Sequence, residues 1–201
     1  MMIIIDCEQN TPEWIKLRLG NPGASSMSKI ITPTGKPSAS ADKYLDDLYD
    51  EIISGEPSKN FYNTYMQKGH EREQESRDLW QMQNDIEIEQ VGIVYQDEQR
   101  LFHASPDGLM PEIRMGFETK NAEPHIQRER RKRTKIEGNH WVQCQMSLYV
   151  TEYDAWVYQS YCRNTEPITI TVYPDLEFIK KMEAELFKFI GKLMVMVKEA
   201  R

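Results

Sequence analysis

The spacing of apolar residues changes along the chain, and this change constrains the fold more than any other feature. Near both ends apolar residues recur every three to four positions, whereas short β-prone runs occupy the middle. Helices are predicted over 11–19, 40–55, 61–83, 139–149 and 175–199, and strands over 86–95, 101–104, 113–120, 153–161 and 168–173. This order predicts a mixed α/β fold. Because no internal repeat or domain boundary interrupts it, we expect one domain over residues 1–201.

The segments between these elements are mostly polar. Residues 21–40 are rich in Gly, Pro, Ser and Thr without periodicity and predict a long loop, and residues 56–60 predict a polar linker. Turn sequences at 97–99 and 106–108 separate the first three strand runs. We therefore expect those three strands to form an antiparallel meander.

Composition excludes several classes of protein. The apolar run at the start of the chain stops at Asp6, too early for a membrane span or a signal peptide, so a cytoplasmic protein without membrane contact is expected. Three scattered cysteines, without a C-x-x-C spacing, argue against a disulfide framework and a structural zinc site. The formal net charge of −7 argues, at face value, against a protein that wraps nucleic acid.

One strand and the turn before it carry the residues best suited to chemistry. Asp107 lies in the turn sequence Ser105-Pro106-Asp107-Gly108, and ten residues separate it from Glu118. Because side chains alternate along a strand, Glu118 and Lys120 share one face, and they lie near Asp107 if the two strands pair. Two carboxylates beside a lysine suit a divalent cation that activates water. Each half of this pattern alone also fits a common turn or a solvated strand edge.

These residues resemble the PD-(D/E)xK nuclease signature, and further motifs occur in the order found in the lambda exonuclease and YqaJ-type viral recombinase nucleases. The resemblance covers about residues 11–160. It is carried by Trp14, Arg18-Leu19-Gly20, Ala24-Ser25, Gly69 with Glu73, Ser105-Pro106-Asp107-Gly108, Glu118-Thr119-Lys120, and Trp141-Val142-Gln143 with Gln145 and Tyr149. It implies a restriction-endonuclease-like fold, a central mixed sheet flanked by helices, with the nuclease core over 11–175 and a C-terminal helix over 175–199.

The resemblance also implies roles for the acidic cluster. Asp107 and Glu118, with the backbone carbonyl of Thr119, match the ligands of Mg²⁺, for which Mn²⁺ is expected to substitute. Lys120 matches the catalytic lysine. Glu73 matches a helix glutamate that completes the cluster, although Glu71 and Glu75 are close to it in the sequence.

Other positions match residues that hold DNA in this family. Arg18, Ser25 and Ser105 correspond to residues that bind the phosphate at the 5′ end, and an arginine offers a permanently charged fork to phosphate oxygens. The chain departs from the family pattern at Gly23, where relatives have a small hydroxyl residue, so a backbone N–H either replaces that hydroxyl or the phosphate goes without it. It departs again at His140, where a relative has a tyrosine.

Two glutamines compete for one place in the site. Gln143 fits the viral exonucleases, whereas Gln145, with Tyr149 four residues later, fits the pattern of RecB-like relatives. Positions two apart on a helix differ by about 200°, so only one is expected to face the site, and Gln143 is favoured as a catalytic and DNA-binding residue. The four histidines, at 70, 103, 125 and 140, show no metal-ligand spacing and are expected to be hydrogen-bonded structural groups.

The cations of this acidic chain are concentrated in one stretch. Six of the eight residues from 128 to 135 are Lys or Arg. Such a run is either a solvated face or a surface that binds the phosphate backbone of DNA. On the second reading, the DNA-binding residues are Arg128, Arg130, Arg131 and Arg133.

The resemblance implies a phage- or prophage-encoded enzyme that digests one strand of linear duplex DNA from 5′ to 3′ and leaves a 3′ single-stranded tail. Relatives form homotrimers and act with a single-strand annealing protein in recombination, so both partners are expected. Alternatives are an endonuclease, a RecB-like nuclease and a DNA-end-binding module without catalysis. An iron–sulfur cluster of the kind found in RecB-like relatives needs four cysteines, and the chain has three.

Overall fold

The computed structural model describes residues 2–57, 65–133 and 135–200, with the backbone alone described for 65–70. Its helices are α1 (Pro12–Arg18), η1 (Ala24–Lys29), α2 (Ala41–Ser54), α3 (Tyr65–Asn84), η3 (Pro111–Ile113), α4 (Pro124–Arg133), α5 (Gly138–Thr151) and α6 (Leu176–Glu199). Its strands are β1 (Ile3–Ile5), β2 (Ile93–Tyr95), β3 (His103–Ala104), β4 (Gly108–Met110), β5 (Met115–Asn121), β6 (Ala155–Tyr161) and β7 (Ile168–Val172). The predicted helix over 61–83 and linker over 56–60 lie partly outside the described residues.

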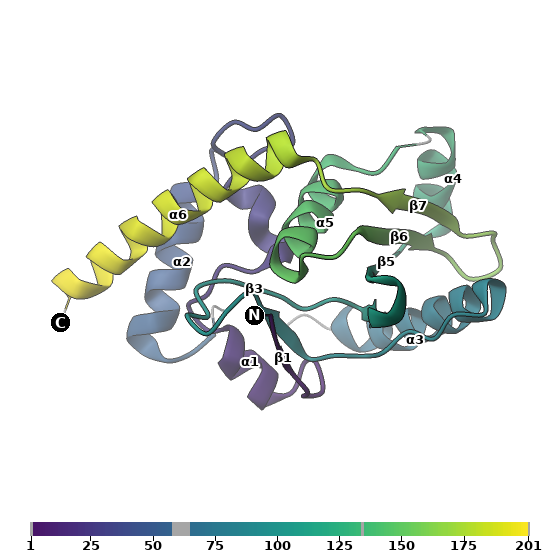
Figure 1. The fold of residues 1–201 in the computed structure, drawn as a ribbon, viewed down its shortest axis with the longest axis horizontal. Helices are drawn as coiled ribbons and strands as arrows, with labels where there is room; N and C mark the ends of the chain where they lie inside the picture. The colour runs from purple at the N-terminus through teal and green to yellow at the C-terminus, as the bar shows by residue number, and fades with distance from the viewer. Residues whose placement is uncertain (1, 58–64, 134, 201) are drawn as a thin grey trace.

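The central sheet is mixed, as predicted. Its order is β4-β5-β6-β7, with β5 and β6 parallel and the two outer pairs antiparallel. The chain between the parallel strands forms α4 and α5, because a parallel connection needs a long crossover. Figure 1 shows α3 against this sheet and α5 beside it. The predicted restriction-endonuclease-like arrangement, a mixed sheet flanked by helices, is confirmed.

The predicted three-stranded meander is confirmed for its first pair of strands and wrong for its third strand. β2 and β3 pair with each other, and β1, which lies in the short apolar run at the start of the chain, pairs with the other edge of β2 to form a second, antiparallel sheet. β5 pairs with β4, a strand that the sequence did not predict. The strand expected over 86–95 is regular only at its end, although Glu89 forms an isolated bridge to Leu109. Pro106 and Pro111 lie on either side of β4. Because proline cannot donate a hydrogen bond to a neighbouring strand, β4 is limited to a short strand of the hairpin.

The predicted loop over 21–40 is also wrong in part, because its first half belongs to the core. It contains η1, which packs against α5, and Met27, Ile30 and Ile31 are fully buried. A single short 3₁₀ helix does not repeat long enough to produce a visible apolar period. The basic run likewise forms a helix, α4, where only a charged stretch was predicted.

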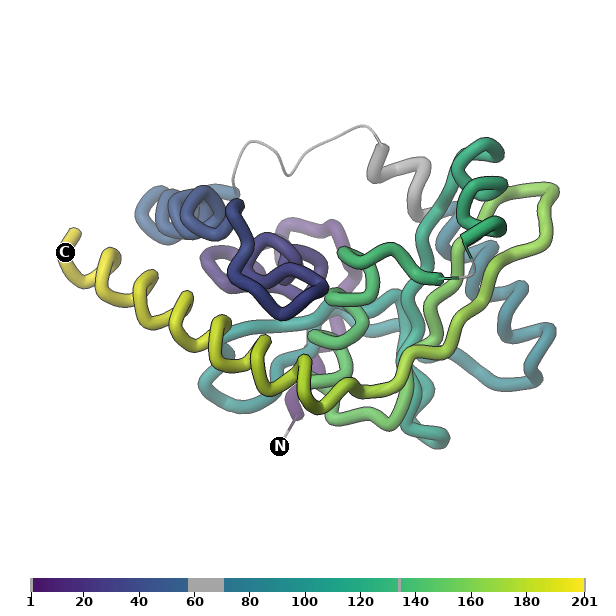
Figure 2. Tube along the Cα trace, turned by 90° about the horizontal axis from the view of Figure 1, so that it is seen from above, coloured from purple at the N-terminus to yellow at the C-terminus, as the bar shows by residue number. Residues whose placement is uncertain are grey.

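The helices predicted from strong signals are confirmed. Thr11 accepts a hydrogen bond from the Trp14 N–H at the start of α1, and Asp175 accepts one from the Phe178 N–H at the start of α6. The apolar stripe of α6 packs on α2, where Phe189 stacks on Tyr44. Figures 1 and 2 place α2 and α6 at one end of the molecule and α3, α4 and the central sheet at the other.

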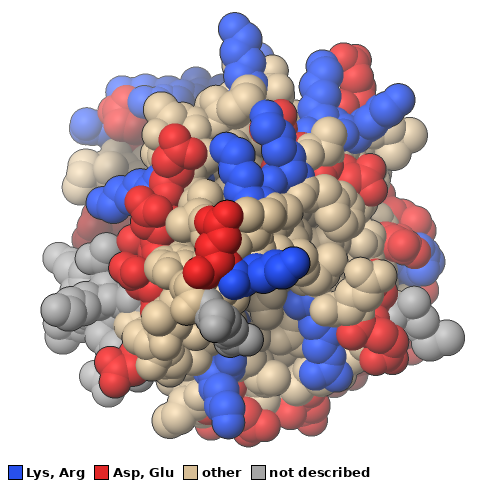
Figure 3. Space-filling view, turned by 90° about the vertical axis from the view of Figure 1, so that its left-hand side faces the viewer, with Lys and Arg blue, Asp and Glu red and all other residues tan. Residues whose placement is uncertain are grey.

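The surface over α2 and the C-terminal end of α6 carries charges of both signs. Figure 3 shows Lys and Arg interspersed with Asp and Glu on this face, without a continuous patch of either sign. None of the helices in the described ranges combines the length and apolar character of a membrane span.

Candidate active site

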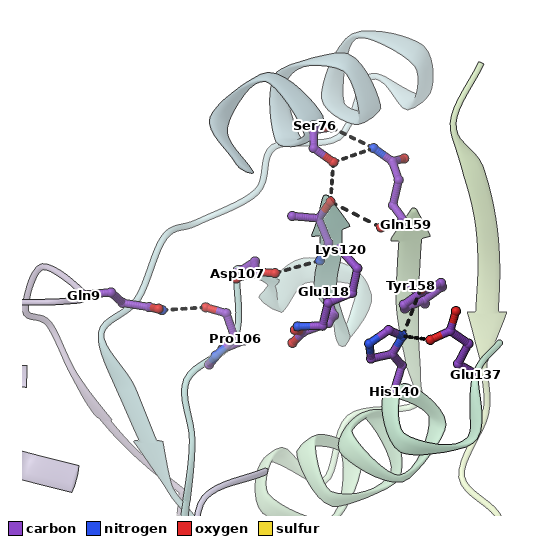
Figure 4. Close-up of polar contacts among 11 residues, drawn as sticks. Gln9, Ser76, Pro106, Asp107, Glu118, Lys120, Glu137, His140, Tyr158 and Gln159 are labelled. Atoms are coloured by element: carbon purple, nitrogen blue, oxygen red, sulfur yellow. Dashed lines mark hydrogen bonds and ion pairs between the residues drawn. The ribbon is translucent and has the colours of Figure 1, made fainter. Parts of the chain in front are cut away.

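Asp107 is fixed to β5 by a hydrogen bond that continues the sheet. It lies directly before β4, and its Oδ2 accepts from the Thr119 N–H at 2.7 Å (Figure 4). The Asp107 carboxylate therefore accepts the hydrogen bond that a backbone carbonyl would accept if β4 continued along β5. Because the N–H and C=O of one strand residue point to the same side, the Thr119 carbonyl faces the Asp107 side of the strand.

Glu118 and Lys120 share the opposite face of β5 from Phe117 and Thr119, as predicted. Glu118 is 2% exposed, and the Lys120 ammonium contacts its Oε1. Burial raises the pKa of Glu118 to about 7, and the neighbouring Lys120 opposes that shift. Burial also lowers the pKa of Lys120, but the carboxylates of Glu118 and Asp107 outweigh it and raise the pKa above its usual value. Lys120 is therefore an ammonium held between two carboxyl groups.

The back of β5 is held by a buried network of polar side chains. The hydroxyls of Ser76 and Thr119 lie 2.6 Å apart, and the Gln159 amide donates to the Ser76 carbonyl at 2.9 Å and to its hydroxyl at 2.8 Å (Figure 4). These bonds join α3 to β5 and β6. Glu73 lies one turn before Ser76 on α3, so the network sets its position.

A cavity of about 150 Å³ brings the predicted residues together. It is lined by Gln9, Asn10, Trp14, Arg18, Ala24, Ser25, Glu73, His103, Ser105, Asp107, Glu118, Lys120 and Gln143. The set includes every side chain that the sequence placed in the catalytic cluster or at the 5′ phosphate. These residues come from elements that are far apart in the sequence, namely α1, η1, α3, β3, β5 and α5. The site therefore exists only in the folded chain.

The structure separates Glu73 from its two neighbours in the sequence. Glu73 lines the cavity. Glu75 instead pairs with Arg163 and accepts from the Tyr161 hydroxyl at 3.0 Å, and Glu71 lies 3.7 Å from Arg163. Among the described residues, no three His, Cys, Asp or Glu side chains are grouped as ligands of one ion. The Thr119 N–H donates a hydrogen bond to one carboxylate oxygen of Asp107, and the Lys120 ammonium forms an ion pair with one carboxylate oxygen of Glu118.

The phosphate-binding candidates form the other wall of the cavity. The Arg18 guanidinium lies over the Trp14 ring, 4.0 Å from its centre. Burial lowers the pKa of Arg18 to about 10, and Tyr44 and Glu51 oppose the shift, so it remains a cation at neutral pH. The Ser105 hydroxyl is buried and has no hydrogen-bond partner within the described part of the chain.

The two glutamines point in different directions, as the helical geometry requires. Gln143 lines the cavity. Gln145 is fully buried elsewhere, where it donates to the Tyr173 carbonyl and accepts from the Asp175 N–H, both at 2.8 Å. Gln145 therefore joins α5 to the start of α6.

His140 is a structural neighbour of the site. Its ring stacks on Tyr158, with Nδ1 3.2 Å from the tyrosine hydroxyl, and lies 3.7 Å from Glu137 (Figure 4). Burial lowers its pKa to about 4, and the nearby Lys120 lowers it further, against the effect of Glu137. The ring is therefore neutral at physiological pH.

The arginines of α4 are engaged within the protein. Arg130 donates to Glu137 at 3.0 Å and to the Ser160 hydroxyl at 2.9 Å, and Arg131 pairs with Glu166 at 3.1 Å. Arg128 lies 3.6 Å from Glu129 but is mostly exposed. Their role in binding the DNA backbone, together with that of Arg133, stays a prediction.

Sequence reasoning missed two parts of the site. Gln9 donates to the carbonyls of Val91 and Pro106, at 2.9 and 2.8 Å, and so ties the N-terminal segment to the turn before Asp107; nothing in the sequence signals this. His103 was expected to be hydrogen-bonded, but neither ring nitrogen has a partner among the described residues. Its place just before Ala104-Ser105-Pro106-Asp107 indicates that it is close to the site, but nothing in the sequence indicates that the ring is buried without a partner.

Comparisons with known proteins agree with this geometry. The family model of the YqaJ-like viral recombinase domain matches residues 13–154, which is more than half of the chain. A search among curated proteins gave no match.

Solved structures show the same fold. An alkaline exonuclease from Laribacter hongkongensis is 23% identical, with a TM-score of 0.84 over 94% of this chain and 96% of that one, and its complex with dAMP matches equally well. A phage-related exonuclease from Haemophilus somnus 129PT is 15% identical, with a TM-score of 0.72 over 90% and 96% of the two chains. The chain therefore belongs to the YqaJ-like viral recombinase family of phage-type nucleases.

Proposed function

We propose that the protein is a Mg²⁺-dependent exonuclease that digests one strand of linear duplex DNA from 5′ to 3′ and leaves a 3′ single-stranded tail for strand annealing. One observation carries this proposal: a single cavity joins the Asp107, Glu118 and Lys120 cluster to the cation and hydroxyls of Arg18, Ser25 and Ser105. An end-directed nuclease needs both halves, one to cut a phosphodiester and one to hold the terminal phosphate.

The donor set fits a hard divalent cation. Glu118 Oε2 is buried without a hydrogen-bond partner within the described residues, which leaves one oxygen available for a ligand. Asp107 and the Thr119 carbonyl face the same edge of β5, and oxygen ligands of this kind suit Mg²⁺ and Mn²⁺. When bound, the ion would neutralise charge on the phosphate and activate a water.

The side chains around this set have separate tasks. Lys120 holds an ammonium next to the carboxylates, where it positions the attacking water and places positive charge beside the phosphate. Arg18 offers a guanidinium to the 5′ phosphate, assisted by the hydroxyls of Ser25 and Ser105. Glu73 and Gln143 complete the polar wall around the scissile bond.

The test uses linear duplexes labelled at either end, with a 5′ phosphate or a 5′ hydroxyl, in Mg²⁺ or chelator. We expect metal-dependent release of nucleotides from the 5′ end by the wild type. Lys120→Ala should lose that activity, whereas Lys180→Ala, on the α6 helix away from the cavity, should keep it. Release from the 3′ end, internal cuts or equal activity of Lys120→Ala would contradict the proposal. Binding of ends without cleavage would favour a DNA-end-binding module.

We further propose the expected assembly and surroundings: a homotrimer that acts with a single-strand annealing protein in the cytoplasm of a bacterial host. Light scattering tests the trimer. Copurification with an annealing protein from the same phage genome tests the partner.

Binding of the DNA backbone by α4 needs its own experiment. Charge reversal at Arg131 and Arg133 should weaken duplex binding. It should also reduce the log–log slope of affinity against salt concentration by about one unit for each phosphate that the variant no longer neutralises. Unchanged affinity at low salt would mean that the ion pairs of α4 only hold the helix in place.

A further inference from the structure

His103 is a buried histidine at the start of β3 that the proposed catalytic steps do not use. It is 2% exposed. Its side chain lines the 150 Å³ cavity and also an adjoining cavity of about 80 Å³, and Arg18 lines both as well. The imidazole and the guanidinium therefore form part of the wall between the two spaces.

The ring occupies the space that a side chain at position 23 would need. Gly23 and His103 are bridge partners, and a Cβ built on Gly23 would lie 2.7 Å from the imidazole Nε2 and 2.9 Å from Cε1. The backbone of Gly23, with φ −108° and ψ 154°, suits any residue. Glycine is therefore required here for space, and the two positions depend on each other.

Neither nitrogen of this ring has a hydrogen-bond partner among the described residues. Leaving a buried polar group unpaired is unfavourable, so such a group is normally satisfied by something that the chain itself does not supply. Burial, and then the charge of Arg18, hold the pKa of His103 well below its usual value. The ring is thus neutral and carries one N–H donor.

The groups around the ring determine what it can bind. Arg18 is a cation, and Ser25 and Ser105 contribute hydroxyls to the same cavity, with the Ser105 hydroxyl also buried without a partner in the described part of the chain. A further N–H donor in this set suits an anion with several oxygens, because each oxygen accepts more than one hydrogen bond.

We propose that His103 is a binding residue for the phosphate at the 5′ end of the DNA, which accepts a hydrogen bond from the imidazole N–H beside Arg18. This rests on the proposed function, since it assigns a residue to the phosphate-binding half of the same cavity. His103 thereby fills the role that a hydroxyl side chain at position 23 could fill if the ring were absent.

The experiment measures binding of short duplexes with a 5′ phosphate or a 5′ hydroxyl in chelator, so that no strand is cut. The wild type should prefer the phosphorylated end. His103→Ala and His103→Phe, the second of which keeps most of the ring volume, should each lose about tenfold of that preference, as expected for one hydrogen bond to a charged group. Binding of the 5′-hydroxyl duplex should be unchanged, and Lys180→Ala, at an exposed position on α6, is the control.

A pair of substitutions tests the shared space directly. Gly23→Ser alone should be destabilised, because its side chain overlaps the His103 ring. Gly23→Ser combined with His103→Ala should restore both thermal stability and the phosphate preference, since the serine hydroxyl enters the vacated space. Full preference in His103→Phe, or no rescue by the double variant, would overturn the proposal.

The binding assay separates this inference from the proposed function. A wild type that cuts DNA but binds both ends equally would reject the role of His103 while the nuclease stands. A wild type that prefers the phosphate but cuts nothing would reject the nuclease activity, and the His103 variants would still decide whether the ring holds the phosphate.

Discussion

The two faces of β5 carry polar side chains that are satisfied in different ways. On the back, Thr119 belongs to a closed network with Ser76 and Gln159, and Phe117 packs on Trp80 with ring centres 5.9 Å apart. On the front, Glu118 keeps one buried oxygen without a partner among the described residues. The back of the strand therefore stabilises the fold, whereas the front keeps capacity for a ligand. Substitutions on the two faces should therefore separate stability from activity.

The largest effect is expected on the front face. Lys120→Ala should lower kcat by roughly 10²–10⁴-fold, the range typical of a residue that positions or transfers a proton. Its melting temperature should stay within a few degrees of the wild type, because Glu118 can take up a proton when its partner is removed. Rates on 5′-phosphorylated duplex measure kcat, and calorimetry measures the melting temperature. If Lys120→Ala were unfolded at ordinary temperature, the front face would also be needed for stability, and the two faces would not differ in this way.

Phe117→Ala tests the opposite face with a core substitution. Phe117 is fully buried, so its truncation should cost about 3–5 kcal/mol of unfolding free energy. The folded fraction should keep kcat within about tenfold of the wild type, because the ring points away from the cavity. Urea unfolding and rates corrected for the folded fraction provide the check. A loss of activity as large as that of Lys120→Ala would mean that the faces are not independent.

His140 lies on the front side of β5 but should affect stability. The division of stability and activity between the two faces is therefore incomplete. Its pKa is about 4 when folded and near 6.5 when unfolded, so the unfolded chain binds the proton more readily. Its contribution is complete above pH 6.5 and declines as pH falls towards 4, by up to about 3 kcal/mol. His140→Phe should keep the stacking on Tyr158 and reduce this decline. Parallel pH profiles for both proteins would contradict it.

The smallest effect is expected in the polar network at the back. Gln159→Leu leaves Ser76 and Thr169 without an amide partner and should cost about 1–3 kcal/mol, whereas Gln99→Leu, at an exposed turn, should cost almost nothing. Because the network fixes α3, a moderate fall in kcat through Glu73 is also expected. An unchanged unfolding midpoint would show that water replaces the amide.

The site was more predictable from the sequence than the sheet around it. Strand alternation placed Glu118 and Lys120 correctly, and helix geometry separated Gln143 from Gln145, because both arguments depend on local backbone periods. In the second sheet β1 was missed, because it is only three residues long and pairs with a distant part of the chain. The burial of η1 was missed for the same reason.

His103 shows a different limit of sequence reasoning. Its bridge to Gly23 joins residues that are 80 positions apart, and a lone histidine has no neighbour in the sequence that signals burial. Gln9 is similar, since both of its acceptors are backbone carbonyls, which every residue type has. Such residues are found only when the tertiary structure is known.

The hairpin that carries Asp107 also explains what the interval between the two carboxylates measures. Gly108 pairs with Phe117, and the chain turns through η3 between the paired strands. Residues added or removed in that turn would lengthen or shorten the loop while the Asp107 carboxylate kept its hydrogen bond to the Thr119 N–H. The count of residues in the motif is therefore a loop length that can drift during evolution, whereas the chemistry depends on the register of two strands.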